Sequence, residues 1–429
     1  MSYFKTIKAE VLATEADIKH LTDTVAGILQ RVRDEGDAAV RYYEKTFDDY
    51  DPATYQVTTE AAARAVDELP PEVIAELDFA IEHVRIFAEA QMASMTETEI
   101  EPFPGFRVGH RLVPVESCAC YVPAGRYPCL TSAVMSVIPA QVAGVKRIVA
   151  CSPPGTLGRI NPGILYTLYK MGVEEIYCFG GAQAIAAMAY GTQSIQPVDL
   201  IVGPGNQWVM EAKRQVFGQV GIDFLAGPSE CLVIADDSGR ADYIAADLIA
   251  QCEHDTQARG AMVCTSEQLA LDTLKEIEKQ LQERTTEATA RESWQNKGSV
   301  VVVDSLEDAV RYSNEYASEH LELHVRDPRS LLPSLRNYGS VFLGENTAEV
   351  YADKVAGPNH ILPTGQAARY TGGLWAGMYM KVITHMETDA AASLKLAKYS
   401  EDQGRYEGMD GHRFAATIRI ENLSGDKKE

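Results

Sequence analysis

The stretch EEIYCFGGAQAIAAMAYG, residues 174–191, decides the fold class. A short run of β-branched and aromatic residues at Glu175–Phe179 leads through a Gly-Gly pair into an Ala-rich helical segment. Comparable short runs recur at Arg147–Ala150, Leu200–Val202 and Cys231–Ala235, and Ala-rich stretches separate them. This alternation predicts βαβ units and parallel sheet, and therefore an α/β fold.

A second set of strand-like runs follows in the later part of the chain, separated by helical stretches such as Ser266–Arg284. These runs are Ala261–Thr265, Ser299–Val303, Leu321–Val325 and Ser340–Leu343. Two α/β modules are therefore predicted. Roughly the first hundred residues have a different, mainly helical pattern, with a helix over 15–45 and another helical stretch over 59–97 interrupted at Pro70 and Pro71.

Composition excludes several classes of protein. The 429 residues include 39 Lys and Arg against 61 Asp and Glu, a formal net charge of -22, which argues against nucleic acid and anionic membrane as partners. The longest nearly apolar stretch, Ser132–Val149, is interrupted by Gln141, Lys146 and Arg147, and is too polar for a membrane span. The first ten residues lack the pattern of a secretion signal, and the eight cysteines form no CxxC pair. We expect a soluble, cytoplasmic protein with reduced thiols.

Two short segments place a histidine beside a second polar group in a predicted structural context. Gln251 and His254 are three residues apart on a predicted helix, so both can reach one metal ion, although a hydrated helix end has the same pattern. Glu319 and His320 directly precede the run Leu321–Val325, where an acid and an imidazole can activate water and accept a proton. Exposed loop residues are the alternative.

Two further segments carry possible ligands in polar surroundings. Asp353 and His360 flank a Gly-Pro turn, and Glu407 and His412 lie in a polar C-terminal segment. Metal ligation would give such a segment a reason to be ordered. A hydrated loop and a charged, mobile tail are the respective alternatives.

Three glycine-rich turns lie next to predicted strands, at 180–184, 203–206 and 226–230. Close approach of the backbone to a ligand is typical of such turns in open α/β sheets. None of them is a GxGxxG fingerprint, and the chain has no GxxxxGK[ST] loop, so a P-loop nucleotidase is not supported. Sharp strand-to-helix connections would have the same composition.

The order of these motifs along nearly the whole chain closely resembles the zinc-dependent histidinol dehydrogenase family. The resemblance is carried by YVPAG (121–125), GGAQAIAA (180–187), GPGN (203–206), AGPSE (226–230), QCEH (251–254), EH (319–320), GPNHILPTG (357–365) and EGMDGH (407–412). It implies two incomplete Rossmann-like α/β modules with parallel sheets and small helical terminal regions, assembled as an intertwined homodimer with shared active sites. The implied division is an N-terminal segment 1–25, a first module of 26–120 with 236–375, an NAD-binding module 121–235, and a C-terminal helical tail 376–429 that reaches the partner.

The resemblance also implies a chemistry: NAD-dependent, four-electron oxidation of a primary alcohol to a carboxylate, with the intermediate aldehyde retained. His320 would then be the base toward the alcohol, and Glu319 would activate the water that hydrates the aldehyde. The NAD contacts would be Tyr121, Gln183 and Asn206. The ligands of Zn2+ would be Gln251, His254, Asp353 and His412, the last from the neighbouring protomer. The substrate contacts would be Ser229, Gln251, His254, His320, Asp353, His360, Glu407 and His412.

One departure from the family bears on the substrate. Histidine-forming members typically have Val-Pro-Gly-Gly followed by small residues, where this chain has Ala124-Gly125-Arg126-Tyr127. The guanidinium of Arg126 suits a sulfonate or carboxylate and would repel the cationic amine of histidinol. This feature is similar to the sulfopropanediol dehydrogenases, and it predicts oxidation of 2,3-dihydroxypropane-1-sulfonate to sulfolactate. Alternatively, Arg126 faces solvent or pairs with one of the many surface carboxylates. The alternatives for the function are oxidation of L-histidinol to L-histidine, a zinc hydrolase, and a zinc-binding structural protein without activity.

Overall fold

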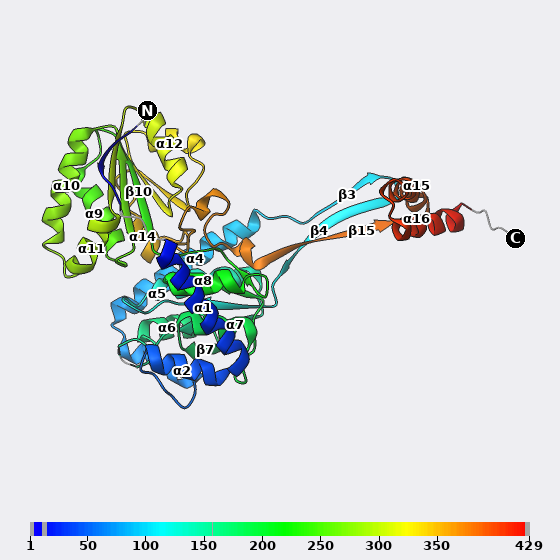
Figure 1. The fold of residues 1–429 in the computed structure, drawn as a ribbon, viewed down its shortest axis with the longest axis horizontal. Helices are drawn as coiled ribbons and strands as arrows, with labels where there is room; N and C mark the ends of the chain where they lie inside the picture. The colour runs from blue at the N-terminus through cyan, green and yellow to red at the C-terminus, as the bar shows by residue number, and fades with distance from the viewer. Residues whose placement is uncertain (1–3, 11–14, 157, 425–429) are drawn as a thin grey trace. The chain divides into compact units, whose positions relative to one another are not determined.

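The computed structural model describes residues 4–10, 15–156 and 158–424, which fall into two compact units (Figure 1). The larger unit comprises Met1–Met92 with Val115–Tyr379, and the smaller comprises Ala93–Pro114 with Met380–Glu429. Among the helices in the described ranges, none is both long and apolar enough to cross a membrane. All eight cysteines are free thiols, and seven of them are buried.

Sheet I, in the larger unit, is built outward from β5 in both directions. Its spatial order is β2 (Gln56–Val57), β7 (Glu175–Cys178), β6 (Arg147–Ser152), β5 (Ser117–Tyr121), β8 (Leu200–Val202) and β9 (Gly221–Ile222). The pairings from β7 to β9 are parallel, and β2 adds an antiparallel edge. Because β6 and β7 lie on one side of β5 and β8 and β9 on the other, the direction of chain progression reverses between β5 and β8.

Successive side chains along each strand of sheet I point to opposite faces of the sheet, as the two-residue period of a strand requires. Ala119 and Tyr121 of β5 share an apolar cluster with the helices of one face. Those helices are α1 (Glu15–Glu35), α2 (Asp37–Phe47), α7 (Gly181–Tyr190) and α8 (Gln207–Val216). The opposite side carries α5 (Leu130–Ala143), which packs against β5, β6 and α6 (Pro162–Lys170). Short α3 (Thr59–Ala63), η1 (Arg64–Glu68) and the long α4 (Pro71–Ala93) complete this part of the chain.

Sheet II, also in the larger unit, repeats the same plan around β10. Its spatial order is β1 (Phe4–Lys8), β12 (Ser299–Val303), β11 (Arg259–Cys264), β10 (Glu230–Ala235), β13 (His320–His324) and β14 (Ser340–Leu343). Only β1 is antiparallel to its neighbour. Sheet II therefore also has a point, between β10 and β13, where the chain changes direction across the sheet.

The two faces of sheet II are covered by different helices. Cys231, Val233 and Ala235 pack under α9 (Ala241–Cys252), α10 (Glu267–Leu281) and α11 (Glu287–Lys297). Leu232 and Ile234 pack under α12 (Leu306–Tyr316) on the other face. The segment after β14 forms α14 (Glu349–Lys354), and short turns occupy α13 (Pro328–Leu331), η2 (Leu332–Ser334), η3 (Ala367–Arg369) and η4 (Ala376–Tyr379).

The smaller unit combines a three-stranded antiparallel sheet with a pair of packed helices. The sheet has the order β15 (Met380–Thr388), β4 (Phe106–Pro114) and β3 (Thr98–Phe103), and the helices are α15 (Ala390–Glu407) and α16 (Asp410–Leu423). The side chain of Asp389 caps α15 by accepting from the backbone N–H of Ala392. Large apolar side chains are exposed here, including Val382 at 61%, Met386 at 66% and Phe414 at 61%.

Several predictions about the elements need correction. The helix predicted over 15–45 is two helices, because Gly36 between α1 and α2 has φ 59°, outside the helical range. The helical stretch predicted to end at 97 stops at Ala93, and the β3–β4 hairpin follows. The C-terminal region predicted to be helical opens with β15, whose register with β4 extends from Met380 to Thr388.

The structure also groups the chain differently from the predicted domain boundaries. The predicted first module joins residues 26–92 to 236–375, but α1 packs on α7 and α8, and β2 pairs with β7. These elements therefore belong to sheet I. The N-terminal segment 1–25 was set apart, yet β1 is a strand of sheet II through its pairing with β12. Residues 93–114 join 380–429 rather than either α/β module, because the antiparallel β4–β15 pairing connects them.

Candidate active site

The carboxyl ends of β5 and β8 form the first part of the candidate site. Tyr121 is the last residue of β5, and Gly203 directly follows β8. Gly203 has φ +117°, and a Cβ atom there would lie 2.2 Å from the backbone oxygen of Tyr121. Only glycine fits this position, so the sequence motif 203–206 reflects a real close approach of two strand ends at the point where a ligand binds in open α/β sheets.

A buried ion pair holds Gly203 from both sides. Lys213 of α8 donates to the Gly203 carbonyl at 2.8 Å, and the Gly203 N–H donates to Asp223 Oδ2 at 2.8 Å. Lys213 and Asp223 also contact each other directly, and their side chains are 1% and 0% exposed. The two charges therefore neutralise each other away from water while they fix the loop.

The three residues predicted to contact NAD lie on or beside these strand ends. The Tyr121 hydroxyl accepts from the Gly181 N–H at 3.2 Å, and Gln183 is a buried residue in the first turn of α7. Asn206 is exposed and caps α8, since its Oδ1 accepts from the N–H groups of Trp208 and Val209. Only the amide NH2 of Asn206 therefore remains to bind a ligand.

Strand β13 carries the second part of the site on one face. His320, Glu322 and His324 alternate with leucines, and the register pairs His320 with Cys231, which packs on the side of α9. All three polar side chains are buried in a sheet whose other strands bury apolar residues there. Because a buried charge is costly without partners, the helices above must supply polar groups.

Two helices supply those partners at four-residue spacing. Asp247 and Gln251 lie on one side of α9, and Glu349 and Asp353 lie on one side of α14. Residues four apart on a helix share a face, so each helix brings two polar groups over β13. We call this group of buried side chains the polar seam; its members are His320, Glu322 and His324 of β13, Asp247 and Gln251 of α9, and Glu349 and Asp353 of α14.

His320 is enclosed at the end of the polar seam. Its Nε2 lies 3.6 Å from Glu349 Oε1 and 3.8 Å from Glu319 Oε2. Burial lowers the pKa of His320 to about 4, with Asp353 acting in the opposite direction. The imidazole is therefore neutral at neutral pH and can accept a proton.

Glu319 is held in place by the backbone of a neighbouring strand. Its Oε2 accepts from the Glu230 N–H at 2.8 Å, and its side chain is 8% exposed. Burial raises the pKa of Glu319 well above its usual range. The carboxyl group of Glu319 thus lies beside the imidazole of His320. Their adjacency in the sequence predicted this pair.

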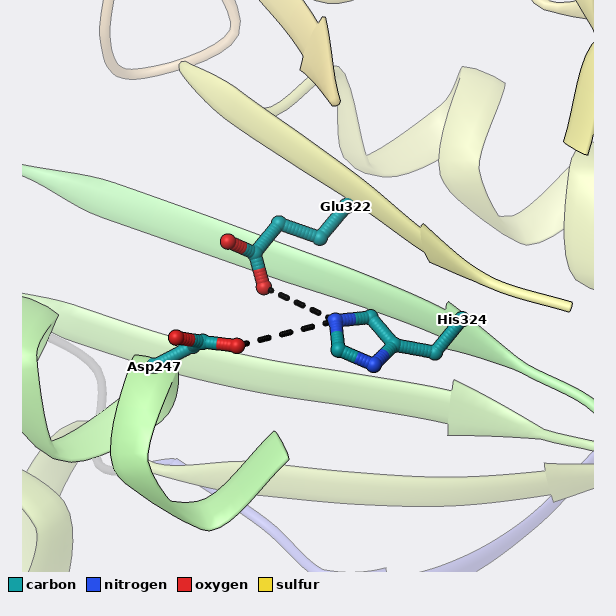
Figure 2. A group of neighbouring side chains, drawn as sticks. All are labelled: Asp247, Glu322 and His324. Carbon is teal, nitrogen blue, oxygen red and sulfur yellow. Dashed lines mark hydrogen bonds and ion pairs between the residues drawn. The ribbon is translucent and has the colours of Figure 1, made fainter. Parts of the chain in front are cut away.

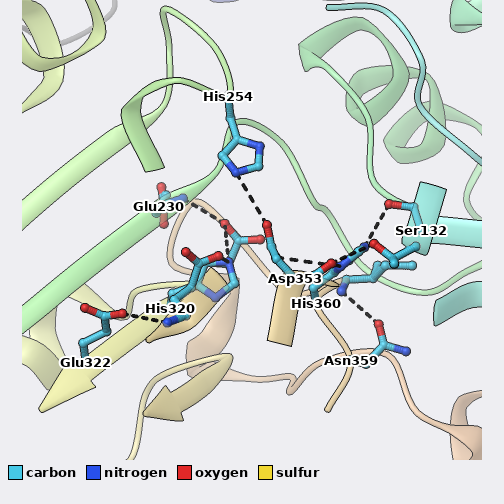
Figure 3. A network of polar contacts seen from close by, with 12 residues as sticks. Ser132, Glu230, His254, His320, Glu322, Asp353, Asn359 and His360 are labelled. Carbon is cyan, nitrogen blue, oxygen red and sulfur yellow. Dashed lines mark hydrogen bonds and ion pairs between the residues drawn. The ribbon is translucent and has the colours of Figure 1, made fainter. Parts of the chain in front are cut away.

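Asp353 joins His254 and His360. Its Oδ2 lies 3.6 Å from His254 Nε2, and its Oδ1 lies 3.7 Å from His360 Nδ1. His360 is oriented by two hydrogen-bonding contacts, with the Asp353 carbonyl at 3.0 Å and with the Ser132 hydroxyl of α5 at 2.9 Å (Figure 3). Although burial raises the pKa of Asp353, the nearby His360, His320 and His254 bring it below the usual range.

Gln251 tests whether these residues fit a metal ion. Its side chain is fully buried, and neither its Oε1 nor its Nε2 has a partner among the described residues. A buried primary amide without partners is rare and costly, and ligation of a cation by its oxygen accounts for it. His254 lies two residues beyond α9, and its N–H donates to the Gln251 carbonyl, so both remain on one turn. The structure therefore places His254 beside Asp353 and keeps Gln251 on the same turn as His254.

A neighbouring group of side chains on α9 and β13 offers a second set of possible metal ligands. Asp247, Glu322 and His324 have ligand atoms within 4.8 Å of one another. Figure 2 shows His324 Nε2 between the two carboxylates, 3.3 Å from Glu322 and 3.6 Å from Asp247. Burial raises the pKa of Asp247 to about 8, with a further rise from Glu322. A proton retained by Asp247 can be shared with Glu322 in this cluster.

The predicted substrate contacts outside the polar seam have varied positions. Arg126 is exposed and donates to the hydroxyl of Thr289 at 2.8 Å. Thr286, at the start of the same helix, bonds to Glu253, the neighbour of His254. Ser229 is half-buried directly before β10. Arg126 has no carboxylate partner among the ion pairs of the described residues, so its charge is available to a ligand.

Glu407 and His412 belong to the smaller unit. Glu407 is the last residue of α15, and His412 lies in the first turn of α16. Both side chains are exposed. Their assignment as a substrate contact and as a metal ligand remains a prediction.

Sequence reasoning missed Glu349, Glu322 and Asp247. The pattern His-Leu-Glu-Leu-His at 320–324 contained the signal, since ionisable residues at alternate positions of a buried strand require partners. The helices that provide them are separated from β13 in sequence, so which acids approach could not be read from the pattern.

A family model, curated relatives and a solved structure all match nearly the whole chain, and all are described as histidinol dehydrogenases or homologs of them. Residues 12–420 match the family model described as histidinol dehydrogenase. A histidinol dehydrogenase homolog of Shouchella clausii is 42% identical over 97% of this chain and 98% of its own. A histidinol dehydrogenase of Zymomonas mobilis is 39% identical over 92% of each. The crystal structure of histidinol dehydrogenase from Elizabethkingia anophelis matches with a TM-score of 0.88 at 31% identity, covering 97% of this chain and 99% of that one.

The buried ion pair below the 203–206 turn gives a stability prediction. Lys213→Met leaves Asp223 charged and unpaired, and we expect unfolding free energy to fall by about 3 kcal/mol or more. The double variant Lys213→Met with Asp223→Asn should recover part of the loss. Lys275→Met, which breaks an exposed pair with Asp272 on α10, should cost less than about 1 kcal/mol. Denaturant unfolding measures all three, and equal losses in the two single variants would contradict the account.

Proposed function

Because the chain belongs to the histidinol dehydrogenase family, whose members are NAD-dependent oxidoreductases that take an alcohol to the acid in a four-electron reaction, we propose that it oxidises the primary alcohol of an anionic diol. The substrate proposed is 2,3-dihydroxypropane-1-sulfonate, and the product is sulfolactate. The balance is one alcohol, one water and two NAD+ to one carboxylate, two NADH and three protons. The observation that carries the substrate choice is the exposed guanidinium of Arg126, which donates to the neutral hydroxyl of Thr289.

We propose His320 as the base in both oxidations. It is buried, neutral at neutral pH and close to Glu319 and Glu349. It would accept the hydroxyl proton while hydride passes to NAD+. Glu319, held by the Glu230 N–H, would remove a proton from the water that hydrates the retained aldehyde.

We propose a Zn2+ site formed by Gln251, His254 and Asp353, with His412 of the partner subunit as the fourth ligand. The unpartnered Gln251 amide and the 3.6 Å approach of His254 to Asp353 support this assignment. A bound cation would polarise the substrate oxygen and favour the ionised form of nearby carboxyl groups. The chain's own residues orient the substrate, with Ser229, His360 and Glu407 as further proposed contacts.

We propose that NAD binds at the carboxyl ends of β5, β7 and β8, with contacts from Tyr121, Gln183 and Asn206. The change of chain direction between β5 and β8 supports this position, because open α/β sheets bind ligands at such points. The Gly203 turn allows the backbone to approach the ligand closely.

Oxidation of L-histidinol is the second candidate. The relatives named histidinol dehydrogenase, at 39% identity in Zymomonas mobilis and 41% in Geobacillus kaustophilus, favour it. A cationic amine would meet repulsion at Arg126, whereas a sulfonate could form charge-assisted hydrogen bonds there. The two candidates therefore differ in the sign of the substrate charge, which a substrate panel resolves.

We also propose that two chains form a homodimer in which each site is completed by the other chain. The exposed apolar residues of the smaller unit, such as Met386 and Phe414, suggest a surface that another chain covers. His412 is exposed in the same unit.

The first prediction of this mechanism separates the two half-reactions. His320→Ala should lower alcohol oxidation by about 100-fold or more. Glu319→Gln should slow oxidation of supplied aldehyde more than that of alcohol, because only the second step needs a hydrated carbonyl. Single-turnover NADH formation from each substrate measures both, with Glu345→Gln, an exposed carboxyl variant, as control. Equal losses in the two half-reactions would contradict this division of roles.

A second prediction tests the substrate through Arg126. The wild type should form NADH with sulfopropanediol and not with histidinol. Arg126→Ala should raise KM for the diol about 10- to 100-fold, the equivalent of about 1.5–3 kcal/mol for a hydrogen bond to a charged group. Thr289→Val, which removes only the hydroxyl that Arg126 contacts, should have a smaller effect. Brisk histidinol turnover without diol turnover would overturn the substrate assignment.

A third prediction tests the shared site. His320→Ala and His412→Ala homodimers should each be nearly inactive. A mixed dimer has one site with both lesions and one site with neither, so unfolding and refolding the two variants together should restore activity toward one working site per mixed dimer. If verified mixed dimers regain no activity, His412 serves its own chain.

A further inference from the structure

Glu44 is a buried carboxyl that the proposed mechanism does not use. It lies on α2, which packs against α7, and its side chain is 0% exposed. Its Oε1 accepts from the Gly180 N–H at 3.1 Å and from Gln183 Nε2 at 2.9 Å. Its Oε2 is buried and has no partner among the described residues. Burying a carboxyl group costs free energy that its hydrogen bonds must offset. Both hydrogen bonds of Glu44 are made to this one turn, which suggests a role there.

The contacts of Glu44 determine how the Gln183 amide is oriented. Because Nε2 is directed to Glu44, the carbonyl oxygen points the other way, over Gly181, where an added Cβ would lie 2.7 Å from it. The Gly181 N–H is held in turn by the Tyr121 hydroxyl. One carboxyl and one hydroxyl thus fix the whole turn that joins β7 to α7.

We propose that Glu44 is a positioning residue for cofactor binding, which holds the Gly180–Gln183 turn so that the Gln183 carbonyl faces the dinucleotide. An oriented carbonyl accepts hydrogen bonds, so Gln183 would bind a hydroxyl or amide N–H of NAD and not its phosphates. The inference rests on the proposed NAD site and adds to it the residue that sets the polarity of this contact.

The charge of Glu44 adds a second readout. Burial raises the pKa of Glu44 to about 8, and the hydrogen bonds from Gln183 and Gly180 act in the opposite direction. The titratable groups facing it are Asp48, Tyr50, Tyr55, Tyr121, Cys151 and Cys178. Each of these is neutral or negative, so ionisation above about pH 8 places an uncompensated negative charge below the turn. An anionic dinucleotide should then bind less tightly.

The test measures NADH binding by fluorescence and steady-state kinetics in full-length enzyme. Glu44→Ala should raise the dissociation constant and the KM for NAD at least about tenfold, with KM for the alcohol unchanged. Glu44→Gln retains a carbonyl acceptor and should stay within about threefold of wild type. Asp49→Asn, an exposed carboxyl just beyond the end of α2, is the matched control and should leave NAD binding unchanged. Wild-type affinity should fall as pH rises through about 8, and Glu44→Gln should show no such fall.

Failure of the positioning role and failure of the proposed NAD site give different results. Glu44→Ala that binds NAD like wild type, or Glu44→Gln that binds as weakly as Glu44→Ala, would overturn the positioning role. Wild-type enzyme that binds no NAD would refute the proposed cofactor instead. Hydrogen exchange of the Gly180–Gln183 amides then decides the role of Glu44 by itself: faster exchange in Glu44→Ala than in Glu44→Gln supports it, and equal exchange overturns it.

Discussion

Burial of ionisable side chains on one face of β13 is the constraint on which the candidate site depends. His320, Glu322 and His324 lie in a sheet whose other strands bury apolar residues on that face. Unpaired, each would cost more free energy than a typical apolar contact provides. Polar groups at four-residue spacing on α9 and α14 approach them, which aligns both helices with the strand. Removing one member would leave its partners with less compensation for their burial.

The two sheets share a strand order but present different ends to the proposed chemistry. In sheet I the candidate cofactor residues follow the carboxyl ends of strands, at Tyr121 and Gly203. In sheet II, Glu319 and His320 lie at the amino end of β13, next to the start of β10 at Glu230. Contacts from α5 to the segment after α14, such as Ser132 with His360, tie the two modules together. In sheet I, buried Lys213 and Asp223 hold the backbone of Gly203. In sheet II, buried Glu319 holds the backbone of Glu230.

Much of this arrangement was predictable from local pattern. Short β-branched runs predicted the central strands, and the Gln251–His254 and Glu319–His320 segments indicated polar centres that the structure brings together with Asp353. The β3–β4 hairpin was missed because β3 is exposed along most of its length and the apolar alternation of β4 is interrupted at Gly109 and His110. The grouping of α1 with sheet I was also missed, since an amphipathic helix shows that it packs without showing against what.

By itself, the sequence determined the α/β class, the positions of most strands, the motifs at their ends and the family to which the chain belongs. Those properties depend on neighbours within a few residues, where side-chain period and backbone restriction act directly. Only the tertiary structure decided that Glu349 lies beside His320, that Glu44 orients Gln183, and that Lys213 and Asp223 hold Gly203. Such contacts join residues far apart in the chain, and their free energy depends on burial and distance, which exist only once the chain has folded.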